Sequence, residues 1–253
     1  RFRRHFLCAF VLLGLIVFSR TLPVQAAGPI SLTTLGSAYT QNFDTLAITG
    51  TTNTLLPTGW ELTESGGGAR DNEQYAADNG GSNTGDTYSY GATSSGERAF
   101  GGLRSSSLIP IIGANFINNT GNVITSLKIS YTGEEWRLGT LSRNDQLDFQ
   151  FSNDATSLTT GTWTDVNDLD FVTPTNTGAV GAKDGNASGF RTALDYTLGG
   201  LSIADGASFW IRWTDVNASG ADDGLAVDDF SLTPNGPVGG TVLSVDDVAQ
   251  NEG

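Results

Sequence analysis

The chain has 253 residues with 13 Lys and Arg against 27 Asp and Glu, which gives a formal net charge of −14 at pH 7. Direct binding of nucleic acid relies on Lys and Arg that face the phosphates, so this balance argues against a direct nucleic-acid partner. The single His and single Cys also leave too few of the ligands on which zinc sites mainly depend.

The first 26 residues have the order of a secretory signal peptide. Arginines dominate the first four positions, an apolar run extends from Phe6 to Phe18, and small residues precede Ala27. A membrane-spanning helix needs about 20 apolar residues, so this run is too short, and no second apolar segment follows. We therefore expect cleavage after Ala26, no membrane span, and a secreted or cell-surface protein.

Removal of this leader would also remove His5 and Cys8, the only imidazole and the only thiol. Neither a Ser–His–Asp nor a Cys–His arrangement can be built without an imidazole base. Zinc sites and disulfides are excluded in the same way. The sequence therefore predicts that this chain is not an enzyme.

Alternation of apolar and polar residues with a period of two, typical of β-strands, recurs along the chain. It is clearest at 127–132, 147–151 and 209–214. Further strands are expected near 30–35, 42–47, 59–63, 87–90, 98–103, 109–117, 162–171, 191–198 and 225–232.

Clusters of Gly, Asn, Asp, Ser and Thr separate these segments, and such residues favour turns. No window shows a sustained helical stripe. We predict an all-β fold over 27–234: an antiparallel β-sandwich of the jelly-roll kind found in carbohydrate-binding modules and lectins. A linker rich in Pro and Gly is expected at 235–241.

Two loops share the pattern D-x-N-x-S-G, at 184–189 and 215–220. Alternating oxygen ligands with Gly in the sixth place allow a loop to curl around Ca²⁺, although neither loop has the flanking helices of an EF-hand. The alternative is an Asx turn in each hairpin. The calcium hypothesis assigns as ligands Asp184, Asn186 and Asp195 for one loop, and Asp215, Asn217 and Asp222 for the other.

A third possible calcium site combines Asp44 with the adjacent Asp228 and Asp229. The first and last strands of a jelly roll often lie side by side, and close carboxylates repel unless a cation lies between them. The alternative is that Asp228 and Asp229 point to opposite faces of the sheet, so that one of them faces water.

Aromatic side chains offer a surface on which sugar rings could stack. Trp213 is in phase with Phe209 and is expected in the core, whereas Trp210 lies on the other face of the strand. We therefore predict Trp210, together with Tyr88 and Tyr90, as the ligand-contacting aromatics.

The adjacent Glu134 and Glu135 raise the question of glycoside hydrolysis, which uses paired carboxylates. Neighbouring strand residues point to opposite faces, so these two cannot easily flank one bond. A structural ion pair with Arg137 is expected instead.

Three segments resemble an exported bacterial jelly-roll β-domain: 41–46 (QNFDTL), 130–137 (SYTGEEWR) and 223–232 (DGLAVDDFSL). That domain is found upstream of extracellular nucleases of the endonuclease/exonuclease/phosphatase type and in surface proteins. The GLAVDD strand is also similar to the last strand of jelly-roll carbohydrate-binding and adhesion domains. After the linker, 242–253 resembles the first strand of a Calx-beta repeat, a calcium-binding module. The chain begins with Arg and ends shortly after this strand starts, so we expect a longer parent protein.

The sequence thus favours a non-catalytic, calcium-stabilised module that serves adhesion or glycan binding, with a glycan or a surface protein as partner. The alternative implied by the resemblance is an accessory domain of an extracellular nuclease whose catalytic domain lies beyond residue 253.

Overall fold

The computed structural model describes residues 28–237, and these residues form two β-sheets and one short 3-10 helix. Threonine, valine, isoleucine and aromatic residues recur in the strands because they fit a pleated, half-buried surface. The elements are β1 (Ile30–Leu32), β2 (Tyr39–Gln41), β3 (Trp60–Ser65), β4 (Tyr75–Asp78), β5 (Asp86–Tyr90), β6 (Ala99–Leu103), β7 (Ile109–Asn118), β8 (Ser126–Leu138), β9 (Gln146–Ser152), β10 (Thr164–Asp165), η1 (Asn167–Leu169), β11 (Phe171–Val172), β12 (Gly181–Ala182), β13 (Arg191–Leu198), β14 (Ser208–Asp215) and β15 (Gly224–Asn235).

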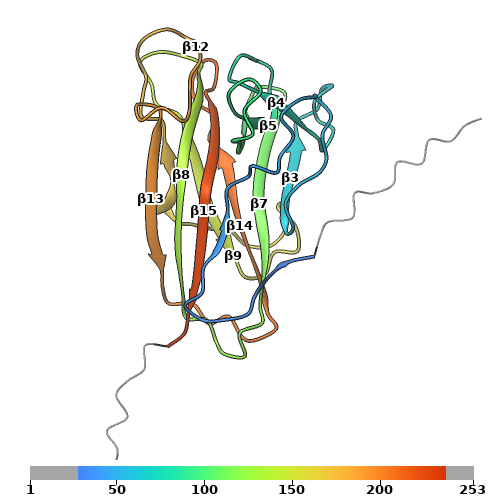
Figure 1. Cartoon of the computed structure of the whole chain (residues 1–253), viewed down its shortest axis with the longest axis vertical. Coiled ribbons are helices and arrows are strands. Elements are labelled where there is room, and N and C mark those ends of the chain that lie inside the picture. The colour runs from blue at the N-terminus through green and yellow to red at the C-terminus, as the bar shows by residue number, and fades with distance from the viewer. Residues whose placement is uncertain (1–27, 238–253) are drawn as a thin grey trace, which may run out of the picture.

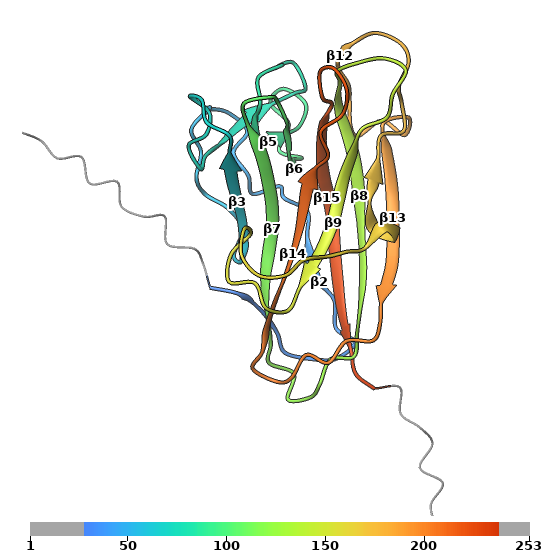
Figure 2. The same ribbon diagram turned by 180° about the vertical axis from the view of Figure 1, so that it is seen from behind.

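The sheets lie face to face as a sandwich (Figures 1 and 2). One sheet has the order β1-β7-β14-β9-β10, with β3 beside β7 and β11 beside β9. The other has the order β12-β8-β15-β6-β5-β4, with β13 beside β8 and β2 beside β15. The pairing is antiparallel except for β1 with β7 and β4 with β5, which are parallel. The predicted all-β sandwich is therefore confirmed.

Aromatic side chains from both sheets fill the space between them. Trp60 of β3 stacks on Trp213 of β14 with ring centroids 6.0 Å apart. Phe230 of the opposite sheet meets both indoles edge-on, at 5.3 and 5.8 Å. Such edge-to-face and offset pairs are the favoured arrangements of aromatic rings. The expectation that Trp213 belongs to the core is confirmed.

Two of the expected strands differ from the structure. The segment expected at 42–47 is a turn, and the strand is β2, which ends at Gln41. The segment expected at 162–171 holds only the two-residue strands β10 and β11, separated by η1. A short segment can alternate between apolar and polar residues and still not form a strand. Whether it pairs depends on neighbouring strands that are distant in the sequence.

β15 continues through Asn235, whose carbonyl accepts a hydrogen bond from the Thr125 N–H, so the first residue of the predicted linker belongs to the strand. The predicted signal peptide at 1–26, the rest of the linker from 238 on and the Calx-beta-like strand at 242–253 lie outside the described residues. Within residues 28–237, no helix is long and apolar enough to cross a bilayer.

Candidate metal centre

A bulge in β15 decides which of its carboxylates face outward. Asp228 pairs with Thr132 of β8, but Ser231 pairs with Ser130, so β15 has one more residue than β8 over this stretch. Asp229 takes up the extra length with a left-handed φ of 49°, a conformation that Asp tolerates better than most residues. As a result Phe230 faces the core as Val227 does, and Asp229 is exposed. Asp228, next to the core-facing Val227, lies on the outer face of the sheet by ordinary alternation.

Glu134 of β8 lies on the same outer face, because it is directly opposite Ala226, two residues before Asp228. Glu97 reaches this place from the loop between β5 and β6. Carboxylate oxygens of Glu97, Glu134 and Asp228 lie within 4.8 Å of one another, and we call these three residues the carboxylate triad. Glu134 is completely buried and Asp228 is 6% exposed.

Each member of the triad keeps one oxygen without a hydrogen-bond partner. The Trp136 Nε1–H donates to Glu134 Oε2 at 2.8 Å, and the Asn186 amide donates to Glu97 Oε2. Glu97 Oε1, Glu134 Oε1 and Asp228 Oδ1 are buried and have no partner. Buried polar atoms in native proteins are normally satisfied by protein, water or an ion, so these three oxygens are free to accept contacts from water or a cation.

No lysine or arginine forms an ion pair with the triad in the described part of the chain. Burial, and to a smaller extent the neighbouring carboxylates, raise the pKa of Glu134 to about 7 and the pKa of Asp228 to about 8. Close carboxylates that lack a cation favour protonation in this way. With oxygen as the only donor atom, the triad suits a hard cation such as Ca²⁺ and does not suit a soft one.

The 184–189 loop does not itself curl around a cation position. The Asn186 N–H donates to Asp184 Oδ1 at 3.2 Å, which is the Asx turn weighed as the alternative, and the Asn186 side chain supports Glu97. Asp195 lies within β13, where it is exposed and pairs with Lys128 at 3.3 Å. The assignment of Asp195 as a ligand is therefore wrong, since counting positions along an EF-hand-like loop does not apply to a strand.

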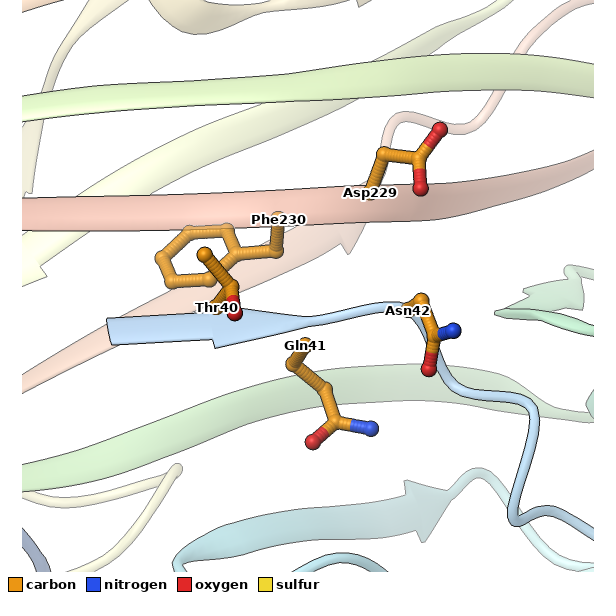
Figure 3. A pocket seen from close by; sticks show the side chains of 5 residues that line it. All are labelled: Thr40, Gln41, Asn42, Asp229 and Phe230. Atoms are coloured by element: carbon orange, nitrogen blue, oxygen red, sulfur yellow. The ribbon is translucent and has the colours of Figure 1, made fainter. Parts of the chain in front are cut away.

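The expected neighbourhood of the first and last strands is present, because β2 pairs with β15. It does not bring Asp44, Asp228 and Asp229 together. Asp44 accepts hydrogen bonds from the Arg98 N–H at 3.2 Å and from the Asn42 amide at 2.6 Å. Asp229 is exposed and borders a shallow pocket with Thr40, Gln41, Asn42 and Phe230 (Figure 3). Of these three predicted ligands, only Asp228 joins the triad.

Asp215 and Asp222 are brought together, and with them lies Asp145, which was not among the predicted ligands. Asn217, the third ligand predicted for this loop, is exposed, whereas Asp215 is buried.

The aromatic residues predicted to contact a ligand are buried. Trp210 is 3% exposed because Ala155 and Leu158, from the loop after β9, cover it. Tyr88 and Tyr90 are each 1% exposed and pack with Trp136 in a small core on the outer face of the eight-stranded sheet. These side chains lie on the outer faces of the sheets but are not exposed, because Ala155 and Leu158 cover Trp210 and the two tyrosines pack with Trp136. The expectation that they form an open surface for a ligand is therefore wrong.

Glu134 and Glu135 do point to opposite faces, as expected, but neither pairs with Arg137. Glu135 accepts hydrogen bonds from the Thr175 hydroxyl and N–H. Arg137 instead donates to the carbonyl oxygens of Gly80 and Gly81, at 3.1 and 3.2 Å. The predicted ion pair is therefore wrong.

Glu97 and Glu134 were not predicted as metal ligands. Glu134 could have been found from the sequence, because it is one of two adjacent acidic residues in an expected strand. Glu97 sits in a polar loop that resembles many others in this chain, and only the fold brings it to Asp228.

A scan against protein-family models finds no match, and a sequence search of curated proteins finds none either. Among solved structures, the chain is similar to the carbohydrate-binding module TmCBM61 in complex with β-1,4-galactotriose, with 12% identity over 56% of this chain and 74% of that one and a TM-score of 0.31. It is similar to the K2 cleaved adhesin domain of Lys-gingipain, with 14% identity over 78% and 98% and a TM-score of 0.40. A structure described as CBM4 gives 14% identity over 70% and 95% and a TM-score of 0.31. Values this low support no inference about function.

Proposed function

We propose that this chain is a non-catalytic, calcium-binding β-sandwich module of an exported protein, and that it serves adhesion or glycan binding. The carboxylate triad carries the calcium part of this proposal. Three close carboxylates without an ion-pair partner, two of them on buried residues, would repel one another, and a divalent cation between them would remove that repulsion and satisfy their free oxygens.

The non-catalytic part is supported by what the folded region contains. The only His and the only Cys are His5 and Cys8, so residues 28–237 provide no imidazole base and no thiol nucleophile. Glu134 and Glu135 face opposite sides of the sheet and cannot act on one bond as an acid and base pair.

The calcium ion would act as a clamp. It would tie the loop that carries Glu97 to the middle of β8 and β15, the most extensively paired strands of the eight-stranded sheet. Anything that binds the folded state alone raises its stability in proportion to the logarithm of ligand concentration.

Thermal unfolding with calcium and with a chelator tests this. Calcium at about 100 times its Kd stabilises by about 2.7 kcal/mol, which corresponds to a rise of roughly 5–10 °C in Tm for a domain of this size. Glu134→Gln keeps the oxygen that accepts from Trp136 but removes a charge, so it should raise Tm in chelator and reduce the rise with calcium.

Glu135→Gln is the matched control, because Glu135 is equally buried, adjacent in sequence and outside the triad. This variant should keep the full response to calcium. An identical Tm of the wild type in calcium and in chelator would overturn the calcium part of the proposal.

The binding role is supported by a pocket of about 430 Å³ that lies beside β12 and is lined by both polar and apolar residues. Its lining includes Asn83, Ser105, Ser106, Arg104 and Arg137, whose amide, hydroxyl and guanidinium groups are the partners that sugar hydroxyls require. The buried indoles and phenols play no part in this surface.

A glycan array with the calcium-loaded protein tests the binding role. The double variant Asn83→Ala/Ser106→Ala changes two exposed residues of the pocket and should lose at least tenfold in affinity for a glycan that the wild type binds. Thr197→Ala, an exposed change on β13, should bind as the wild type does. Equal binding by the double variant would show that this pocket is not the site.

A further inference from the structure

A second group of carboxylates lies where several strands end. Asp215 ends β14, Asp145 directly precedes β9, and Asp222 lies two residues before β15. One carboxylate oxygen from each residue lies within 4.8 Å of the others, and we call these three residues the aspartate cluster. All three are buried, with exposures of 2% for Asp145, 3% for Asp215 and 6% for Asp222.

The aspartate cluster is only partly neutralised by arginine. Arg143 pairs with Asp145 at 3.0 Å and with Asp223 at 3.4 Å, so its charge is shared between these two. Arg104 donates its guanidinium N–H to the backbone carbonyl of Asp215, at 2.8 Å, and not to the carboxylate. Within residues 28–237, neither Asp215 nor Asp222 forms an ion pair.

One oxygen of the aspartate cluster has no partner. Asp215 Oδ2 accepts from the Arg104 N–H at 3.2 Å, whereas Asp215 Oδ1 is buried without a hydrogen bond. The other two carboxylates are held by backbone donors: Asp222 accepts from the Ala218 N–H at 2.9 Å, and Asp145 from the Gln146 N–H at 2.9 Å. The three side chains are thus fixed in place, and the oxygen left over is nearly inaccessible to solvent.

From this arrangement we infer a second divalent-cation site, formed by Asp145, Asp215 and Asp222 and distinct from the carboxylate triad. The ligands are all oxygen, which selects a hard cation such as Ca²⁺. Asp222 also lines the pocket near β12, so the cation has a route from solvent, and water or a ligand from that pocket can complete its coordination. The inference stands on its own contacts and does not require the triad to bind.

Calorimetric titration of the folded chain with Ca²⁺ tests the second site, because it measures how many Ca²⁺ ions each variant binds. The wild type should bind two Ca²⁺, and Asp215→Asn should bind one. Asp222→Asn, at the rim of the pocket, gives the same test if the deeper variant folds poorly. Glu134→Gln should also leave one site, and its combination with Asp222→Asn should leave none.

Asn217→Ala is the matched control, because Asn217 belongs to the same sequence motif as Asp215 but is exposed and outside the aspartate cluster. This variant should bind two Ca²⁺. A count that stays unchanged in both Asp215→Asn and Asp222→Asn would overturn the second site. A count reduced by Asp222→Asn and unchanged by Glu134→Gln would instead overturn the triad and leave the second site standing.

Discussion

At the scale of single residues, the position of Glu134 depends on the Trp136 indole, whose N–H is the one hydrogen-bond donor to its carboxylate among the described residues. Gly185 packs directly against that ring. A Cβ at position 185 would come within 2.5 Å of Trp136 Nε1, and the buried indole would have to move.

Gly185→Ala should therefore destabilise the domain by about 1–3 kcal/mol, the usual cost of overpacking, and should weaken calcium binding at the triad. Urea unfolding and calcium titration measure the two effects. Gly189→Ala, in the same loop with no atom within 4 Å of its Cβ, should change stability by less than about 0.5 kcal/mol. Equal stability of the two variants would mean that the indole has room to move.

The sequence indicated that several Asp residues are metal ligands, but it did not indicate which residues lie together in one site. Asp228, Asp215 and Asp222 were predicted as ligands, and each lies in a group of close carboxylates. Glu97 and Asp145 could not be assigned because their partners are distant in sequence. The outward-facing aromatics were predicted from strand phase, which gives the face of a sheet but not whether a loop covers that face, as one does over Trp210.

At the scale of elements, the segments with the clearest period-two alternation lie in β8, β9 and β14, and two of the further expected segments lie in β7 and β15. The bulge in β15 is different. The pattern of Leu225, Val227, Phe230 and Leu232 breaks phase between Val227 and Phe230, and this break is the one sequence signal for the bulge. Without the extra residue, Asp229 and Ser231 would face the core in place of Phe230 and Leu232. The bulge therefore serves the core, because it keeps Phe230 and Leu232 inside and Asp229 out.

At the scale of the whole molecule, Asp and Glu outnumber Lys and Arg, so the free energy of unfolding should depend on pH through carboxyl groups whose pKa changes on folding. Asp148 lies on the outer face of the seven-stranded sheet and is a member of neither the carboxylate triad nor the aspartate cluster. Burial, followed by the nearby Asp170 and Asp165, raises the pKa of Asp148 to about 6, against the lowering effect of Arg212.

The folded chain then binds a proton at Asp148 between about pH 4 and pH 6, where the unfolded chain has released it. Because the folded state holds more protons in this window, the free energy of unfolding falls as the pH rises through it, and the stabilising contribution is lost above about pH 6. Since Asp148 is partly solvated, we expect a contribution of no more than about 1 kcal/mol.

Urea unfolding in chelator at pH 4 to 7 measures this contribution, and the free energy of unfolding of Asp148→Asn should depend less on pH than that of the wild type. Asp195→Asn, at an exposed ion pair with Lys128, should follow the wild type. Parallel curves for Asp148→Asn and the wild type would mean that Asp148 is ionised throughout this range and that solvent reaches this face of the sandwich freely.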